Sequence, residues 1–168
     1  FTNLFYTPGR QQDAHEFLQA LTREQAPHLY TACEGLDSPT LQCRECGRGR
    51  FAAPEPCTWL ALSLVRSEGN IWTSVQAALN AVLAPEPLTD HDFRWTCPDP
   101  TCASQQLPIK EHKLSVNPCV LCIQLVRWRG RRNQDALLHD VACEQTLDCQ
   151  GTAYALRSVV CHMGGTPQ

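Results

Sequence analysis

The sequence predicts an α+β domain, and three observations support this. Two segments carry the i, i+3, i+4, i+7 apolar spacing of a helix with one buried face. Several shorter segments are strongly apolar or alternate in the manner of strands. Two pairs of closely spaced cysteines, Cys43/Cys46 and Cys97/Cys102, lie far apart in the chain. Since each pair offers two thiolates, together they match the four ligands of a tetrahedral structural Zn²⁺. We therefore expect a zinc site that joins these two segments.

The residues around the cysteine pairs favour zinc over chance or disulfide bonding. Pro98, Pro100 and residues 47–49 form turns, as two sulfurs that face one ion require. One such pair is a weak signal, whereas two pairs in a reduced protein indicate a metal. Disulfides fit less well, because the chain has 11 cysteines, an odd number, and no feature of secretion. The separation of Cys97 and Cys102 is wider than the commonest two-residue spacing.

Composition describes an ordinary folded domain. The chain has 168 residues, of which 43% are hydrophobic and 18% charged, as in globular proteins. Its net charge of −3 gives no reason to expect nucleic acid or an anionic membrane as a partner. No segment approaches the roughly 18 apolar residues of a membrane span, and no signal peptide is visible. We expect a cytoplasmic or nuclear protein and, since Met163 is the only methionine, a piece of a longer reading frame.

The first predicted helix follows a loop over residues 1–9 and begins near residue 11. Asp13 and Glu16 lie in its first turns, where carboxylates complement the helix dipole. Pro27 is expected to end it, or at least to prevent its uninterrupted continuation. Its apolar face consists of Ala14, Phe17, Leu18 and Leu21.

Strands and a second helix are expected next. The first cysteine pair lies in a predicted hairpin, with Leu41 leading in and Phe51 leading out. Residues 59–64 alternate large apolar and small side chains, which predicts a strand with its leucines on one face. The second helix opens at Thr73 with a sequence like a capping box and ends before Pro85. Its apolar stripe consists of Val75, Leu79, Val82 and Leu83.

The remainder of the chain is predicted to be mainly β. Cys119 and Cys122 have the spacing of a metal-binding pair, but residues three apart on a strand point to opposite faces, so we expect packed core thiols. Residues 129–133 form a basic turn, and residues 136–147 contain a strand and a loop. The other predicted strands are a short one over 93–97, an exposed one over 109–116, a central one over 118–128 and a final one over 154–162.

The string Gln-Gln-Asp-Ala-His-Glu-Phe-Leu at residues 11–18 resembles a signature of the ubiquitin-specific proteases, the papain-like deubiquitinases. The resemblance continues in register over nearly the whole chain. It includes both cysteine pairs, residues 62–64, 86–88 and 118–128, and Tyr154 to Gly164. It implies an incomplete form of the family's fold, with thumb helices in 1–30, fingers with a zinc ribbon in 31–117 and palm strands in 118–168.

By this resemblance, the parent protein would hydrolyse the isopeptide bond after the C-terminal glycine of ubiquitin, using a thiol. Zinc would be structural, and the partners would be ubiquitin and ubiquitinated proteins. Gln12 and Asp13 would lie near the ubiquitin tail, where the carboxylate of Asp13 can take a bidentate tail arginine. From the residue pattern alone, Asp13 is equally well explained as an acid at a helix start.

The chain contains no residue that we assign to catalysis. The family's nucleophile lies in an Asn-x-Cys-Tyr segment before the first helix, and that segment is absent. His162 matches the first histidine of the family's H-x-G…G-H-Y pattern, whereas the second is the base. We expect structural roles for His15 and His162 and no hydrolysis by this chain alone. Two alternatives remain open: a catalytically inactive ubiquitin-binding relative, and a zinc-ribbon interaction module unrelated to ubiquitin. The remaining unassigned cysteines are Cys33, Cys57, Cys143 and Cys149.

Overall fold

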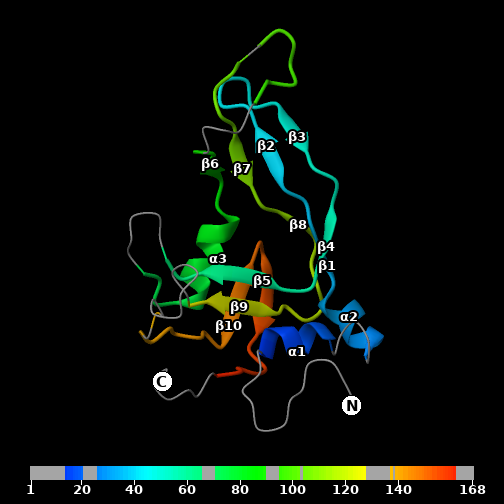
Figure 1. Cartoon of the computed structure of the whole chain (residues 1–168), viewed down its shortest axis with the longest axis vertical. Helices are drawn as coiled ribbons and strands as arrows, with labels where there is room; N and C mark the ends of the chain where they lie inside the picture. The colour runs from blue at the N-terminus through cyan, green and yellow to red at the C-terminus, as the bar shows by residue number, and fades with distance from the viewer. Residues whose placement is uncertain are drawn as a thin grey trace.

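A narrow arm of strands rises from a wider base that holds the helices (Figure 1). The computed structural model describes residues 14–20, 26–65, 71–89, 95–102, 104–127, 137 and 139–161. Helices and strands are mixed within these residues, as the predicted α+β class requires. None of the described helices is long and apolar enough to cross a membrane. The helices are α1 (Ala14–Ala20), α2 (Pro27–Cys33) and α3 (Val75–Leu83).

Two antiparallel sheets form the arm. The outer sheet has the order β3-β2-β7-β6, and the inner one has the order β4-β1-β8. The predicted hairpin around the first cysteine pair is confirmed, since β2 and β3 pair from Thr40↔Phe51 to Gln42↔Gly49. The outer strands are β2 (Thr40–Gln42), β3 (Gly49–Phe51), β6 (Glu86–Pro87) and β7 (Ile109–Glu111). The inner strands are β1 (Gly35–Asp37), β4 (Glu55–Cys57) and β8 (Leu114–Val116).

The base contains the main hydrophobic core. Strand β5 (Leu60–Ser63) pairs in parallel with β9 (Ile123–Val126), and α3 packs against β5. The hairpin of β10 (Thr146–Cys149) and β11 (Thr152–Ala155) also contacts α3. The predicted leucine face of residues 59–64 is confirmed, because Leu62 and Leu64 are fully buried. The buried core consists of Leu62, Leu64, Val75, Ala78, Leu79, Leu114 and Cys149.

The N-cap of helix α3 lies one residue later in the sequence than predicted. Ser74, and not Thr73, is the N-cap, and its hydroxyl accepts a hydrogen bond from the Ala77 N–H at 3.2 Å. Ser74 also donates a hydrogen bond to Glu144, whose carboxylate accepts the Gln76 N–H at 3.3 Å. A carboxylate remote in sequence thus accepts one of the free N–H groups at the start of the helix, which the local pattern could not reveal.

The structure corrects the prediction for the first helical region. Pro27 is the first residue of a separate helix, α2, where its missing N–H costs no hydrogen bond, and Ala26 before it is not helical, so no helix continues through Pro27, as predicted. Phe17, expected in the core, is 51% exposed. The periodicity identifies a face of the helix, but burial of that face depends on which elements lie against it. Leu21 lies outside the described residues.

Four strand predictions also need correction. Residues 95–97 form no strand, and 109–116 divides into β7, which lies between β2 and β6, and β8 in the other sheet. Of residues 118–128, only β9 is a strand, and within the described residues its partner is β5. The final strand ends at Ala155, and Val160 beyond it is 77% exposed. An apolar run predicts a strand only where a neighbouring backbone completes the hydrogen bonds.

The two cysteines at the start of the predicted central strand differ from expectation as well. Cys119 is exposed, whereas Cys122 is partly buried with its Sγ 3.6 Å from the Sγ of Cys33 at the end of α2. The segment before β9 is irregular, so the alternation of a strand does not apply to it. Burial, followed by the neighbouring Cys33, raises the pKa of Cys122 to about 12.

Candidate metal centre at the end of the arm

The first ligand loop is the turn between β2 and β3. Cys43 follows β2 directly, and its N–H donates to the Arg48 carbonyl at 2.9 Å. The Gly47 N–H donates to the Cys43 carbonyl at 3.0 Å. Gly47 has a φ of +72°, a left-handed conformation that glycine adopts without strain. This tight turn brings Cys43 and Cys46 to the same side of the hairpin end.

The second ligand loop is held mainly by its own backbone and by Asp99. The Cys97 N–H donates to the Ser104 carbonyl at 3.1 Å, and the Cys102 N–H donates to the Asp99 carbonyl at 3.1 Å. Asp99 Oδ1 accepts the Thr101 N–H at 2.9 Å and the Thr101 hydroxyl at 2.6 Å. These bonds replace the predicted strand as the feature that positions the second cysteine pair.

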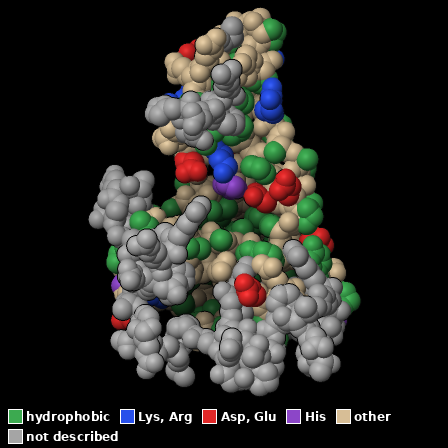
Figure 2. All heavy atoms as spheres, viewed as in Figure 1, with side chains coloured by type: hydrophobic (Ala, Val, Ile, Leu, Met, Phe, Trp, Pro, Cys, Tyr) green, Lys and Arg blue, Asp and Glu red, His purple; other side chains and the backbone are tan. Residues whose placement is uncertain are grey.

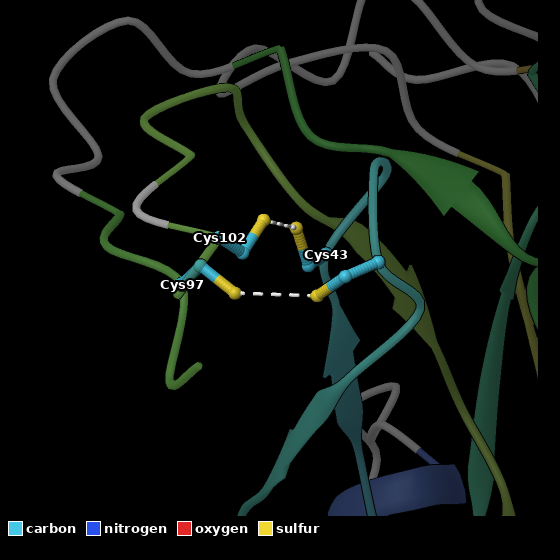
Figure 3. A group of neighbouring side chains, drawn as sticks. Cys43, Cys97 and Cys102 are labelled. Atoms are coloured by element: carbon cyan, nitrogen blue, oxygen red, sulfur yellow. Dashed lines mark hydrogen bonds between the residues drawn. The ribbon is translucent and has the colours of Figure 1, made fainter. Parts of the chain in front are cut away.

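The structure brings the four predicted cysteines together. Their Sγ atoms all lie within 4.8 Å of one another, with Cys43 to Cys102 at 3.8 Å and Cys46 to Cys97 at 3.5 Å (Figure 3). Sulfurs placed about 2.3 Å from a central zinc ion would be about 3.8 Å apart at tetrahedral angles. The donor set and its spacing therefore fit zinc, and all 11 cysteines of the chain are free thiols.

Burial and hydrogen bonding shift the pKa values of two of these thiols in opposite directions. Hydrogen bonds from the backbone of Cys46 and Glu45 lower the pKa of Cys43 to about 6. Desolvation raises the pKa of Cys97 to about 12. A metal ligand must be a thiolate, so zinc binding would have to release the proton of Cys97.

A small hydrophobic cluster supports the site. Cys43, Trp95 and Cys97 are buried together, and Leu41 and Cys102 pack against them. The Arg50 guanidinium lies over the Trp95 ring, 6.0 Å from its centroid. This cluster is separate from the core of the base. Sequence reasoning did not identify Trp95 as part of the site, although its position two residues before Cys97 was a usable signal.

Other predicted site residues lie elsewhere or cannot be placed. Gln12, Asp13 and His162 are outside the described residues. Where the chain passes from the outer to the inner sheet of the arm, His112 Nδ1 lies 3.1 Å from Asp37 Oδ2. Charged side chains gather in the middle of the face shown in Figure 2. Cys57 is no activated nucleophile, because burial and the charge of Asp37 raise its pKa.

Comparison with known proteins identifies the family. The family model described as ubiquitin carboxyl-terminal hydrolase matches residues 2–168. The chain belongs to this family, which confirms the resemblance seen at residues 11–18. No curated protein sequence matches it.

SAGA deubiquitinase modules are among the solved structures with a similar fold. A Ubp8/Sgf11/Sus1/Sgf73 module bound to monoubiquitin matches with a TM-score of 0.66 at 24% identity, over 83% of this chain and 33% of that one. The same module bound to ubiquitin aldehyde matches with a TM-score of 0.66 at 24% identity, over 83% of this chain and 32% of that one. A yeast module with an altered Sgf73 matches with a TM-score of 0.58 at 22% identity, over 83% of this chain and 30% of that one. This chain therefore spans about a third of the length of these relatives and has the ubiquitin-specific protease fold over that part.

Proposed function

We propose that this chain is part of a deubiquitinase domain whose parent protein hydrolyses the isopeptide bond after the C-terminal glycine of ubiquitin. The observation that carries the proposal is the match of the ubiquitin carboxyl-terminal hydrolase family to residues 2–168. The reaction requires a thiolate, a histidine within hydrogen-bond reach and a group that orients the histidine. Our proposal assigns none of these roles to this chain, which instead contributes scaffold and ubiquitin-binding surface. Its free thiols suit the cytoplasm or nucleus.

The proposal divides the chain as the family resemblance does, into thumb (1–30), fingers (31–117) and palm (118–168). The two sheets of the arm lie within the proposed fingers, although the same range also contains β5 and α3, which belong to the base (Figure 1). Cys43, Cys46, Cys97 and Cys102 would hold a structural zinc ion, which would tie the two loops at the end of the arm. Nothing in the arrangement calls for the ion to act on a substrate, since four thiolates fill a tetrahedral site.

Titration of ubiquitin into the chain tests the partner. We expect measurable binding to intact ubiquitin and weaker binding to ubiquitin that lacks its C-terminal tail. If Asp13 pairs with a tail arginine, Asp13→Ala weakens binding about tenfold, the loss of a charge-assisted hydrogen bond. Glu16→Ala, which removes an acid that is exposed in α1, is the control. If Asp13→Ala binds ubiquitin with unchanged affinity, Asp13 does not contact the ubiquitin tail. If the unaltered chain does not bind intact ubiquitin, the zinc-ribbon interaction module is favoured instead.

Metal analysis tests the zinc site separately. We expect about one zinc per chain, and its loss in Cys97→Ser. Cys149→Ser is the matched control, because Cys149 is also a buried thiol but belongs to the core of the base. Zinc that survives replacement of Cys97 would show that the ligand assignment is wrong.

A further inference from the structure

Two pairs of side chains connect the loop that carries Cys43 and Cys46 with the loop that carries Cys97 and Cys102. Arg48 Nε, from the first loop, lies 3.1 Å from Asp99 Oδ2 in the second. Glu45 Oε1, also from the first loop, accepts a hydrogen bond from Gln106 Nε2 at 2.9 Å, just beyond the second loop. Each loop therefore contacts the other through polar groups that are not metal ligands.

Asp99 is the centre of this arrangement. Its side chain is only 12% exposed, although it carries a charge. One carboxylate oxygen accepts both donors of Thr101, the other meets Arg48, and its own N–H donates to the Cys97 sulfur at 3.4 Å. A single residue thus shapes its loop, orients a ligand sulfur and reaches the opposite loop.

Glu45 makes a second, more exposed contact with the cluster. Its Oε2 lies 3.9 Å from the Cys102 sulfur, at the limit of a weak thiol hydrogen bond. Its other oxygen faces Gln106. Because this bridge is exposed, it exchanges with water and contributes less than the buried carboxylate of Asp99.

We propose that Asp99 is a positioning residue for the metal centre, which holds the two ligand loops in binding geometry before the ion arrives, with Glu45 as a weaker second bridge. The inference rests on the zinc site proposed above. The physical reason is entropic, since loops that are already held together need less ordering when they bind the ion. Groups outside the ligand set that orient metal ligands typically change affinity by about 10–100-fold.

Zinc transfer to a chromophoric chelator measures the effect. We expect Asp99→Ala, which removes both the Thr101 hydrogen bonds and the Arg48 ion pair, to weaken zinc affinity by about 10–100-fold. Arg48→Gln, which removes only the ion pair, should weaken it by less than about fivefold, because the Arg48 side chain is 70% exposed and its ion pair is screened by water. Asp148→Ala is the matched control, since Asp148 Oδ1 also accepts a backbone N–H in a turn, that of Gly151, but away from the cluster. An Asp99→Ala affinity equal to that of Asp148→Ala would overturn the proposal.

A second measurement uses metal-free protein, so that it does not depend on the zinc site. Diamide accepts the two electrons and two protons released when a pair of thiols forms a disulfide. If Asp99 holds the loops in place, disulfides between the two cysteine pairs, such as Cys46 to Cys97, form more slowly in Asp99→Ala than in the Asp148→Ala control. Equal rates would overturn the positioning role. A slower rate in Asp99→Ala, with no zinc in the unaltered protein, would uphold that role while refuting the zinc site.

Discussion

Replacing Leu79 by alanine tests whether the base and the end of the arm are separate cores. Leu79 lies in α3, is 0% exposed and packs among the buried residues of the base. The change removes three carbon atoms, which corresponds to about 2.4 kcal/mol of lost burial at about 0.8 kcal/mol each. Because β5 and the β10–β11 hairpin both pack against α3, the space can collapse only partly, and a cavity term adds to the loss. We therefore expect the free energy of unfolding to fall by about 3–4 kcal/mol.

Urea unfolding followed by circular dichroism measures this loss. Leu156→Ala is the control, because Leu156 is 43% exposed and its truncation should change the free energy of unfolding by about 0.5 kcal/mol or less. Under native conditions, Leu79→Ala should still bind zinc as the unaltered protein does, since Leu79 is not in the cluster around Cys43 and Trp95. A loss below about 1 kcal/mol would refute the cavity argument. Loss of zinc from a folded variant would refute the separation of the two cores.

Three further predictions concern the stability of the inner sheet and the base. Gly35→Ala should lower the free energy of unfolding by about 1–3 kcal/mol, because its Cβ would lie 2.8 Å from the Val116 carbonyl oxygen, as a denaturation curve would show. Burial raises the pKa of Glu144, but the hydrogen bonds it accepts at the start of α3 outweigh burial and lower it. The carboxylate of Glu144 therefore stabilises the fold at pH values above its pKa in the unfolded chain, and this stabilisation is lost as pH falls through its lower pKa in the folded protein. Glu144→Gln should accordingly reduce the fall in the free energy of unfolding at acid pH. An unchanged fall would contradict this. Tyr154→Phe should cost about 1 kcal/mol in thermal unfolding, since the hydroxyl donates to the Pro118 carbonyl at 2.8 Å; no change would show that water replaces this bond.

The clustering of Cys43, Cys46, Cys97 and Cys102 could be predicted because part of its signal is local. Closely spaced thiols beside turn-forming residues favour a turn that brings two sulfurs to one side, and Gly47 lies in such a turn. The leucine face of β5 was predictable for a related reason, since alternation along a strand assigns side chains to faces. The family was recognisable from residues 11–18 because that string is long and specific.

What only the tertiary structure decided depends on pairs of residues remote in sequence. The bridge from Arg48 to Asp99 and the cap that Glu144 adds to α3 join positions that no local pattern relates. Exposure of Phe17 was likewise unpredictable, because periodicity marks an apolar face without saying what covers it. Sequence by itself therefore determined which residues can form turns, which strand residues share a face and which side chains can bind a metal, because these depend on the short-range sterics and chemistry of each segment. Three-dimensional packing decided which of these segments meet, because hydrogen bonds and burial require a partner.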